Sequence, residues 1–191
     1  MPCFPVTIEV GDNAHVPQGY ISHEANNPFN IRPAGSKTNF NIYANMASGF
    51  LAGVNLLERY MNLENKTLKA NKEKWGTADQ PVTFEEVIRT WSPVGDGNSA
   101  EKVQEYVDYV SERTGLPADT ELTNDNLFSL AQAMIGMECP KCEDEINSQY
   151  GGLRGMLEAI RGGYDPGAPA PKPNKSEGGA TPTEEDEAWG N

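Results

Sequence analysis

Apolar residues recur at helical spacing through much of the chain, most clearly in residues 124–138. There one stripe carries Leu127, Leu130, Ala131, Met134 and Ile135. Asn124 and Asn126 are both suitable caps for the start of such a helix. One further step along the stripe reaches Glu138. We therefore predict a helix that ends near Glu138 and buries the face on which that residue lies.

Four other segments have the same spacing: residues 46–61, 83–91, 98–115 and 151–161. Thr83 and Glu86 match a capping box, and Asn98 with Glu101 can cap the third segment, which Gly115 closes. Helical periodicity therefore dominates, and we predict a mainly α (α+β) domain over residues 23–163.

The remaining segments lack this periodicity. Residues 1–22 are an arm with one plausible strand at 6–10, and residues 23–43 indicate loops and short strands that form a small β or loop lobe. Residues 66–80 are polar and predict a surface loop, in which Trp75 either stacks on a sugar or anchors the loop. Residues 164–191 are acidic and rich in Pro and Gly, which predicts a disordered tail.

Charge and composition exclude several classes of protein. The net charge of -13 argues against nucleic acid as a partner, because phosphate is bound through Lys and Arg clusters. The sequence has no apolar run long enough for membrane insertion and no signal-peptide pattern at its start. Three cysteines cannot form a disulfide framework. We expect synthesis in a reducing cytoplasm.

Glu138 is the first candidate for chemistry. A carboxylate on the buried face of a last helical turn loses water and faces the negative end of the helix dipole, and both effects favour the protonated acid. Pro140 prevents the helix from continuing, so Glu138 is expected where the helix gives way to a loop. A proton donor held near neutral pH suits glycosidic-bond cleavage. The alternative is a Glu138 that turns outward and is solvated.

An asparagine-rich segment is the second candidate. Asn26, Asn27, Asn30 and Arg32 offer hydrogen-bond donors and acceptors that suit sugar hydroxyl and acetamido groups. Asn-Asn-Pro is also an ordinary turn, and that interpretation remains open from the residues alone.

Cys139 and Cys142 form a CxxC pair, which supplies half the ligands of a zinc site. The site would need Cys3, His15, His23 or an acid such as Glu143 to complete it, so the pair is a weak metal candidate. We expect two buried or reduced cysteines and no cofactor. A cross-link formed in the oxidising periplasm is the alternative.

The order of these features is itself informative. Asn26-Asn27-Pro28-Phe29-Asn30-Ile31-Arg32 is followed by Phe40 and Tyr43, Gly49-Phe50-Leu51-Ala52, Trp91-Ser92-Pro93, Asn98, Tyr106, and Ala133-Met134-Ile135 before Glu138. Over residues 24–140 this series resembles a family of phage virion proteins with Asn-Asn-Pro-Gly-Asn-Ile-Arg and Trp-Ala-Pro segments. The family resembles the peptidoglycan-degrading protein of an enveloped double-stranded RNA phage. The resemblance implies a lysozyme-like fold.

A second resemblance concerns the mechanism. In flagellar-type glucosaminidases, a helix that ends in a catalytic Glu precedes an Asn-Asn-Leu-Phe-Gly-Ile-Lys segment. Residues 130–138 and 26–32 are similar to these two parts in the reverse order. The resemblance implies a circularly permuted lysozyme-like domain in which Glu138 lies against the loop of residues 26–32, with Tyr43 and Trp91 lining the cleft.

The sequence also departs from the family pattern. Phe29 replaces a Gly, and Asn39 replaces an Asp that could serve as a second carboxylate. The loss of that Asp favours a lytic transglycosylase with one catalytic acid over a hydrolase that needs two. Glu24 is the alternative acid.

The resemblance implies a virion protein that is made in the host cytoplasm and acts on the cell wall in the periplasm. Its expected partners are peptidoglycan and other virion structural proteins. Two competing hypotheses remain: a virion structural protein that kept the fold without activity, and a metal-binding adaptor built around Cys139 and Cys142.

Overall fold

A computed structural model describes residues 6–8, 22–32, 40–43, 45–95 and 97–161 of the chain. Most of the arm at 1–22, Asn39 and the predicted tail at 164–191 lie outside these residues. The described part is mainly helical, which confirms the predicted fold class. None of its helices combines the length and the apolar character needed to cross a membrane.

The elements in chain order are β1 (Val6–Ile8), β2 (Phe40–Ile42), α2 (Met46–Met61), α3 (Lys66–Trp75), α4 (Phe84–Trp91), α5 (Ala100–Thr114), α6 (Leu127–Glu138), α7 (Pro140–Tyr150) and α8 (Leu153–Arg161). The two strands pair antiparallel, with Val6 opposite Ile42 and Ile8 opposite Phe40. A short helical turn at residues 22–24 precedes the asparagine-rich loop. The small β lobe therefore joins segments from both sides of that loop.

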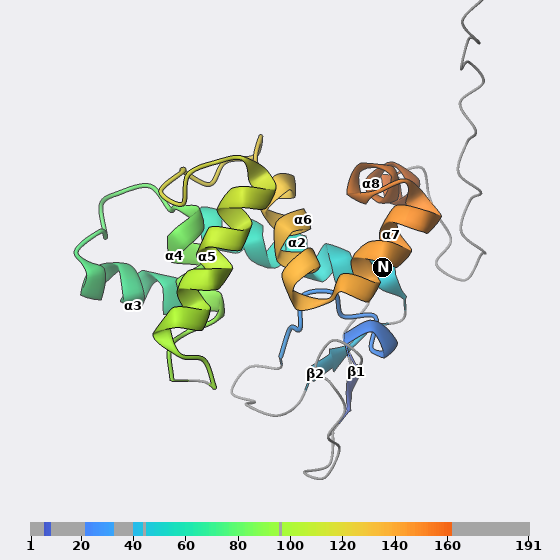
Figure 1. Cartoon of the computed structure of the whole chain (residues 1–191), viewed down its shortest axis with the longest axis horizontal. Helices are drawn as coiled ribbons and strands as arrows, with labels where there is room; N and C mark the ends of the chain where they lie inside the picture. Colours follow the sequence, from blue (N-terminus) through green and yellow to red (C-terminus); the bar gives the residue numbers. More distant parts are fainter. Residues whose placement is uncertain (1–5, 9–21, 33–39, 44, 96, 162–191) are drawn as a thin grey trace, which may run out of the picture.

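Helix α6 lies at the centre of the helical part and contacts α2, α5 and α7 (Figure 1). Its predicted apolar stripe is confirmed, because Leu130, Ala131, Met134 and Ile135 are all buried. Burial of this stripe on several sides fixes the rotation of α6 about its axis. The direction in which Glu138 leaves the helix end is therefore set by the core.

Two glycines on α2 allow the asparagine-rich loop to lie directly on that helix. A Cβ at Gly49 would be 1.8 Å from the backbone oxygen of Asn26, and a Cβ at Gly53 would be 2.0 Å from the ring of Phe29. Phe29 is fully buried and stacks on Phe50 with 6.1 Å between ring centroids. Phe29 thus anchors the loop in the core.

The predicted surface loop at 66–80 is wrong over its first ten residues, which form α3. Asn65 caps this helix, and Leu68 is fully buried. Lys72 is only 1% exposed because its ammonium group pairs with Glu86 on α4. Trp75 ends the helix and is 41% exposed, so it does not anchor a loop in the core.

A second correction concerns the end of α6. Pro140 does end that helix at Glu138, but it also begins α7, with Cys139 as the only residue between the two helices. Proline is compatible with the first position of a helix because the N–H group it lacks has no partner there. Glu138 therefore lies at a sharp corner between helices and not at the start of a loop. At the start of α5, the capping residue is Ser99 and not Asn98.

Candidate active site

Glu138 contacts the asparagine-rich loop, as the sequence predicts. Asn30 Nδ2 donates to Glu138 Oε2 at 2.7 Å and to the Glu138 backbone carbonyl at 3.2 Å. One side chain thus binds both the carboxyl group and the last carbonyl of α6. The contact joins residues that are 108 positions apart in the chain.

The orientation of the Asn30 amide group is fixed by a hydrogen bond to its oxygen atom. The Ser22 hydroxyl donates to Asn30 Oδ1, so the NH₂ group must face Glu138. Asn30 also has a positive φ of 53°, a conformation that Asn adopts more readily than most residues. Ser22 is buried and was not identified from the sequence, because its role appears only in the folded loop.

Trp91, the last residue of α4, supplies a second donor to the carboxyl group. Its Nε1 donates to Glu138 Oε1 at 3.1 Å. The indole packs edge-on against Phe29, with ring centroids 6.2 Å apart, and lies 6.3 Å from the Tyr60 ring. These contacts from the loop and from α2 hold Trp91 in place, so the predicted Trp91 does lie at this site.

Tyr106 of α5 is the third side chain beside the carboxyl group. In the sequence it belongs to an apolar stripe and to the series of residues that carries the family resemblance, but it was not predicted as a site residue. Its hydroxyl is buried and makes no hydrogen bond of acceptable geometry within the described residues. It is nevertheless close enough to Glu138 that each group changes the pKa of the other. A tyrosine on a buried stripe needs a partner for its hydroxyl, and that need was the available signal.

The pKa of Glu138 is raised above 4.5, mainly because burial penalises the charged carboxylate. The side chains of Asn30, Tyr106 and Trp91 favour the carboxylate and oppose this effect, as does the positive charge of Arg32. The net shift is upward. Glu138 therefore stays protonated to a higher pH than an exposed glutamate, as a general acid requires.

The other predicted residues of the loop have different environments. Asn27 is fully buried, donates to the carbonyls of Ile31 and Asn41 at 2.9 and 3.0 Å, and accepts from the Ile31 N–H at 2.9 Å. All of these bonds lie inside the loop and the lobe. The predicted role of Asn27 in substrate binding is not supported, because its polar groups already have partners.

Asn26 and Tyr43 also serve the loop. Asn26 has a φ of 51° and donates from Nδ2 to the Tyr43 carbonyl at 3.1 Å. Tyr43 is buried, which raises the pKa of its hydroxyl, and that hydroxyl accepts a hydrogen bond from Asn41 at 3.3 Å. Tyr43 therefore does not line an open cleft. The structure uses it to connect the loop to β2.

Arg32 and Glu24 lie at the surface of the same region. Arg32 is partly buried and its guanidinium carbon is 5.2 Å from the centroid of the Phe40 ring, while its charge acts on Glu138. Glu24 is exposed. An exposed carboxylate lacks the desolvation that favours a proton donor, so the geometry favours Glu138 over Glu24 as the acid.

Cys139 and Cys142 form a disulfide and are both buried. Their sulfur atoms are bonded to each other, so neither cysteine has a thiolate that could bind a metal. This bond contradicts the prediction of Cys139 and Cys142 as weak metal ligands. Within the described residues, no group of three or more His, Cys, Asp or Glu side chains is arranged to hold a metal. The burial of the pair is confirmed, and the cross-linked state is the one present.

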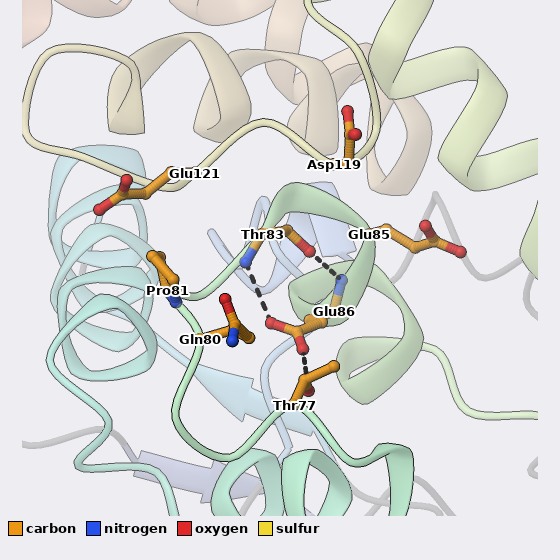
Figure 2. Close-up of a pocket in the computed structure, with 8 residues that line it drawn as sticks. All are labelled: Thr77, Gln80, Pro81, Thr83, Glu85, Glu86, Asp119 and Glu121. Atoms are coloured by element: carbon orange, nitrogen blue, oxygen red, sulfur yellow. Dashed lines mark hydrogen bonds between the residues drawn. The ribbon is translucent and has the colours of Figure 1, made fainter.

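A separate pocket lies between the end of α3, the start of α4 and the segment before α6 (Figure 2). It is lined by Glu85, Glu86, Asp119 and Glu121 together with Thr77, Gln80, Pro81 and Thr83. Its carboxylates do not converge: Glu86 turns toward Thr77 and the Thr83 N–H, while Glu85 points away. None of the Glu138 contacts line it, so this pocket is not part of the candidate active site.

No protein-family model matches this chain, and a search of curated proteins found no similar sequence. The geometry around Glu138 is therefore the main guide to function.

Proposed function

We propose that this protein cleaves the glycan strands of bacterial peptidoglycan between N-acetylmuramic acid and N-acetylglucosamine, with Glu138 as its one catalytic carboxyl group. The observation that carries the proposal is the Glu138 carboxyl, which has a raised pKa and lies between the neutral donors Asn30 and Trp91. The resemblance of residues 24–140 to phage virion proteins supports peptidoglycan as the substrate.

The reaction class that fits one carboxyl group is that of a lytic transglycosylase. Glu138 donates its proton to the glycosidic oxygen, and the leaving N-acetylglucosamine takes the bonding electron pair. The 6-hydroxyl of the muramic acid then attacks its own C1 and gives its proton to the Glu138 carboxylate. The product is a 1,6-anhydro sugar. No water is consumed and Glu138 ends protonated, so the catalyst is regenerated.

The surroundings of Glu138 support one carboxylate over two. Hydrolases that use two acids place the carboxyl groups roughly 5 to 10 Å apart. Among the described residues, the groups that shift the pKa of Glu138 include Arg32 but no second carboxylate. Arg32 would contribute positive charge near the carboxyl group or position an anionic part of the muropeptide.

The proposal includes delivery by a phage particle, with other virion proteins as neighbours. The competing non-catalytic structural protein has a specific requirement, which is a Glu138 that faces solvent or a partner subunit. Asn30 and Trp91 instead bind the carboxyl group of the partly buried Glu138 at 2.7 and 3.1 Å. This arrangement favours the enzyme.

The test compares wild type with Glu138→Gln on purified peptidoglycan, with soluble products identified by mass spectrometry. We expect anhydromuropeptides from the wild type and a loss of rate of roughly a hundred- to ten-thousandfold in the variant, because a positioned acid contributes about that factor. Products with reducing ends would instead indicate a hydrolase.

Glu24→Gln is the matched control, since Glu24 is an exposed carboxylate in the same region. It should retain wild-type activity. If Glu138→Gln is as active as wild type while Glu24→Gln is not, the acid is Glu24. If the wild-type protein releases no fragments from peptidoglycan of several chemotypes, the proposed activity is wrong and the hypothesis of a non-catalytic structural protein remains.

A further inference from the structure

The buried hydroxyl of Tyr106 needs an explanation. Buried polar groups are nearly always paired, because an unpaired one costs free energy. Tyr106 is 5% exposed, and its hydroxyl lacks a hydrogen-bond partner within the described residues. The group it faces is the Glu138 carboxyl. A hydroxyl at this position can form hydrogen bonds that a phenylalanine ring could not.

The two direct partners of Glu138 can only donate to it. Trp91 Nε1 has no acceptor capacity, and the Asn30 amide is oriented with its NH₂ group toward the carboxyl by Ser22. Neither can accept the O–H of a neutral acid. Before substrate arrives, the acid proton therefore has no acceptor from these two residues.

A tyrosine hydroxyl can both donate and accept. We propose that Tyr106 is a positioning residue for the catalytic proton, accepting a hydrogen bond from the neutral Glu138 acid and donating one to the Glu138 carboxylate. This inference rests on the proposed function. The tyrosine keeps its own proton throughout, so the hydrogen bond reverses direction without any net transfer. The acid proton is held beside Tyr106 until a glycosidic oxygen replaces the tyrosine as its acceptor.

The charges around this pair leave Tyr106 neutral. Burial and the nearby Glu138 raise the pKa of Tyr106 well above 10, and burial raises the pKa of Tyr60 to about 12. Among the described residues, the titratable and charged groups that the contacts place near this pair are Arg32 in the loop, Tyr60 on α2, Tyr109 and Arg113 on α5, and Glu143 on α7. Arg113 and Glu143 pair with each other near Gly136. Of the two groups, Glu138 is therefore the one that gains and loses a proton, while Tyr106 stays neutral.

The test is Tyr106→Phe, with Tyr109→Phe as its matched control. Tyr109 lies three residues further along α5, is partly exposed, and contacts Arg113 and the Gly136 side of α6. Two quantities are measured: the rate of peptidoglycan cleavage from pH 4 to 9, and the Glu138 titration by ¹³C NMR of labelled glutamate, assigned by difference from Glu138→Gln.

We expect Tyr106→Phe to lower the maximum rate roughly tenfold, about the effect of one hydrogen bond to a charged group. The titration of Glu138 should move to higher pH, because a hydrogen bond to a carboxylate is stronger than one to a neutral acid and its loss costs the carboxylate more. The alkaline limb of the rate profile should move with it. Tyr109→Phe should change neither.

The NMR result separates the two proposals. A Tyr106→Phe variant with native circular dichroism and an unchanged Glu138 titration overturns the role of Tyr106, whatever the activity. A fully active Glu138→Gln variant overturns the proposed function instead. If Tyr106→Phe does not fold, 3-fluorotyrosine at position 106 replaces it. As a stronger donor and weaker acceptor, it should move the Glu138 titration to lower pH, and no movement would again overturn the inference.

Discussion

Glu86 on α4 is a buried carboxyl group and Glu138 on α6 is a partly buried one, and their partners differ. Glu86 faces the ammonium group of Lys72, with 2.9 and 2.7 Å from Nζ to its two oxygens. Glu138 receives its hydrogen bonds from the neutral Asn30 and Trp91. In general, a nearby cation favours the charged form of a carboxyl group, whereas neutral donors leave its protonation state to their balance with burial. The comparison distinguishes an ion pair that serves the fold from a carboxyl group that can donate a proton.

The largest effect on stability is expected from breaking the ion pair between Lys72 and Glu86. Lys72→Met leaves Glu86 without a cation, and loss of one partner of a buried pair costs about 3–5 kcal/mol. Denaturant unfolding monitored by circular dichroism would measure the change. The double variant Lys72→Met/Glu86→Gln should recover most of the loss, since Gln also completes a capping box. A Lys72→Met cost no larger than that of Glu138→Gln would remove the distinction between the two sites.

A smaller loss is expected from moving the loop that carries Asn30. Gly53→Ala places a methyl group against the buried Phe29 ring, and overpacking of this kind costs about 1–3 kcal/mol. The displaced ring carries Asn30 away from Glu138, so activity should fall even at temperatures where the variant remains folded. Asn55→Ala, an exposed change on the same helix, is the control. Unchanged cleavage by folded Gly53→Ala would mean that the Asn30 contact is not needed.

The disulfide beside Glu138 should contribute about 2 kcal/mol by the loop-entropy estimate for so short a loop. The double variant Cys139→Ser/Cys142→Ser avoids leaving one free thiol. Its unfolding free energy is compared with that of oxidised wild type, and wild type under reducing conditions should match the variant. If oxidised and reduced wild type unfold at the same denaturant concentration, the cross-link does not stabilise this corner.

The smallest effect concerns stability against pH. The folded state raises the pKa of Glu138, so it binds the proton more tightly than the unfolded state. The contribution of Glu138 to stability is therefore fully present below the unfolded value of about 4.5 and is lost as pH rises through the folded pKa. Glu138→Gln should flatten this dependence. Parallel stability curves for wild type and Glu138→Gln would contradict the raised pKa.

Periodicity predicted the helices that bury a continuous stripe, including α6 and its last residue. It failed at α3 because Lys72 is polar by composition and is buried only through a partner 14 residues away. It failed at α7 because Pro140 indicates a stop for one helix as well as a start for the next. Nonlocal pairing and the two possible roles of proline are not visible in local sequence.

The segments that form the candidate site were predicted, but the role of each side chain within it was not. The resemblance to flagellar-type glucosaminidases implies that Glu138 and residues 26–32 lie together, but it cannot say which asparagine faces the acid. The folded loop decides this: Ser22 orients the amide of Asn30 toward Glu138, whereas the amide of Asn27 donates to carbonyls of the loop and of β2. The role of the Tyr106 hydroxyl was not predicted. A tyrosine on a buried stripe gives the same apolar pattern whether or not its hydroxyl takes part in the site.

The corner at Cys139 also limits how the length of this chain can vary. One residue added or removed there would change the direction in which α7 leaves α6. Because the core fixes the rotation of α6, the change would fall on α7 and on the disulfide between Cys139 and Cys142. An insertion between α4 and α5, where Gly95 and Gly97 have positive φ and open space around them, would leave that corner untouched. We therefore expect related chains with this chemistry to differ in length between α4 and α5 and to have the same length at the corner between α6 and α7.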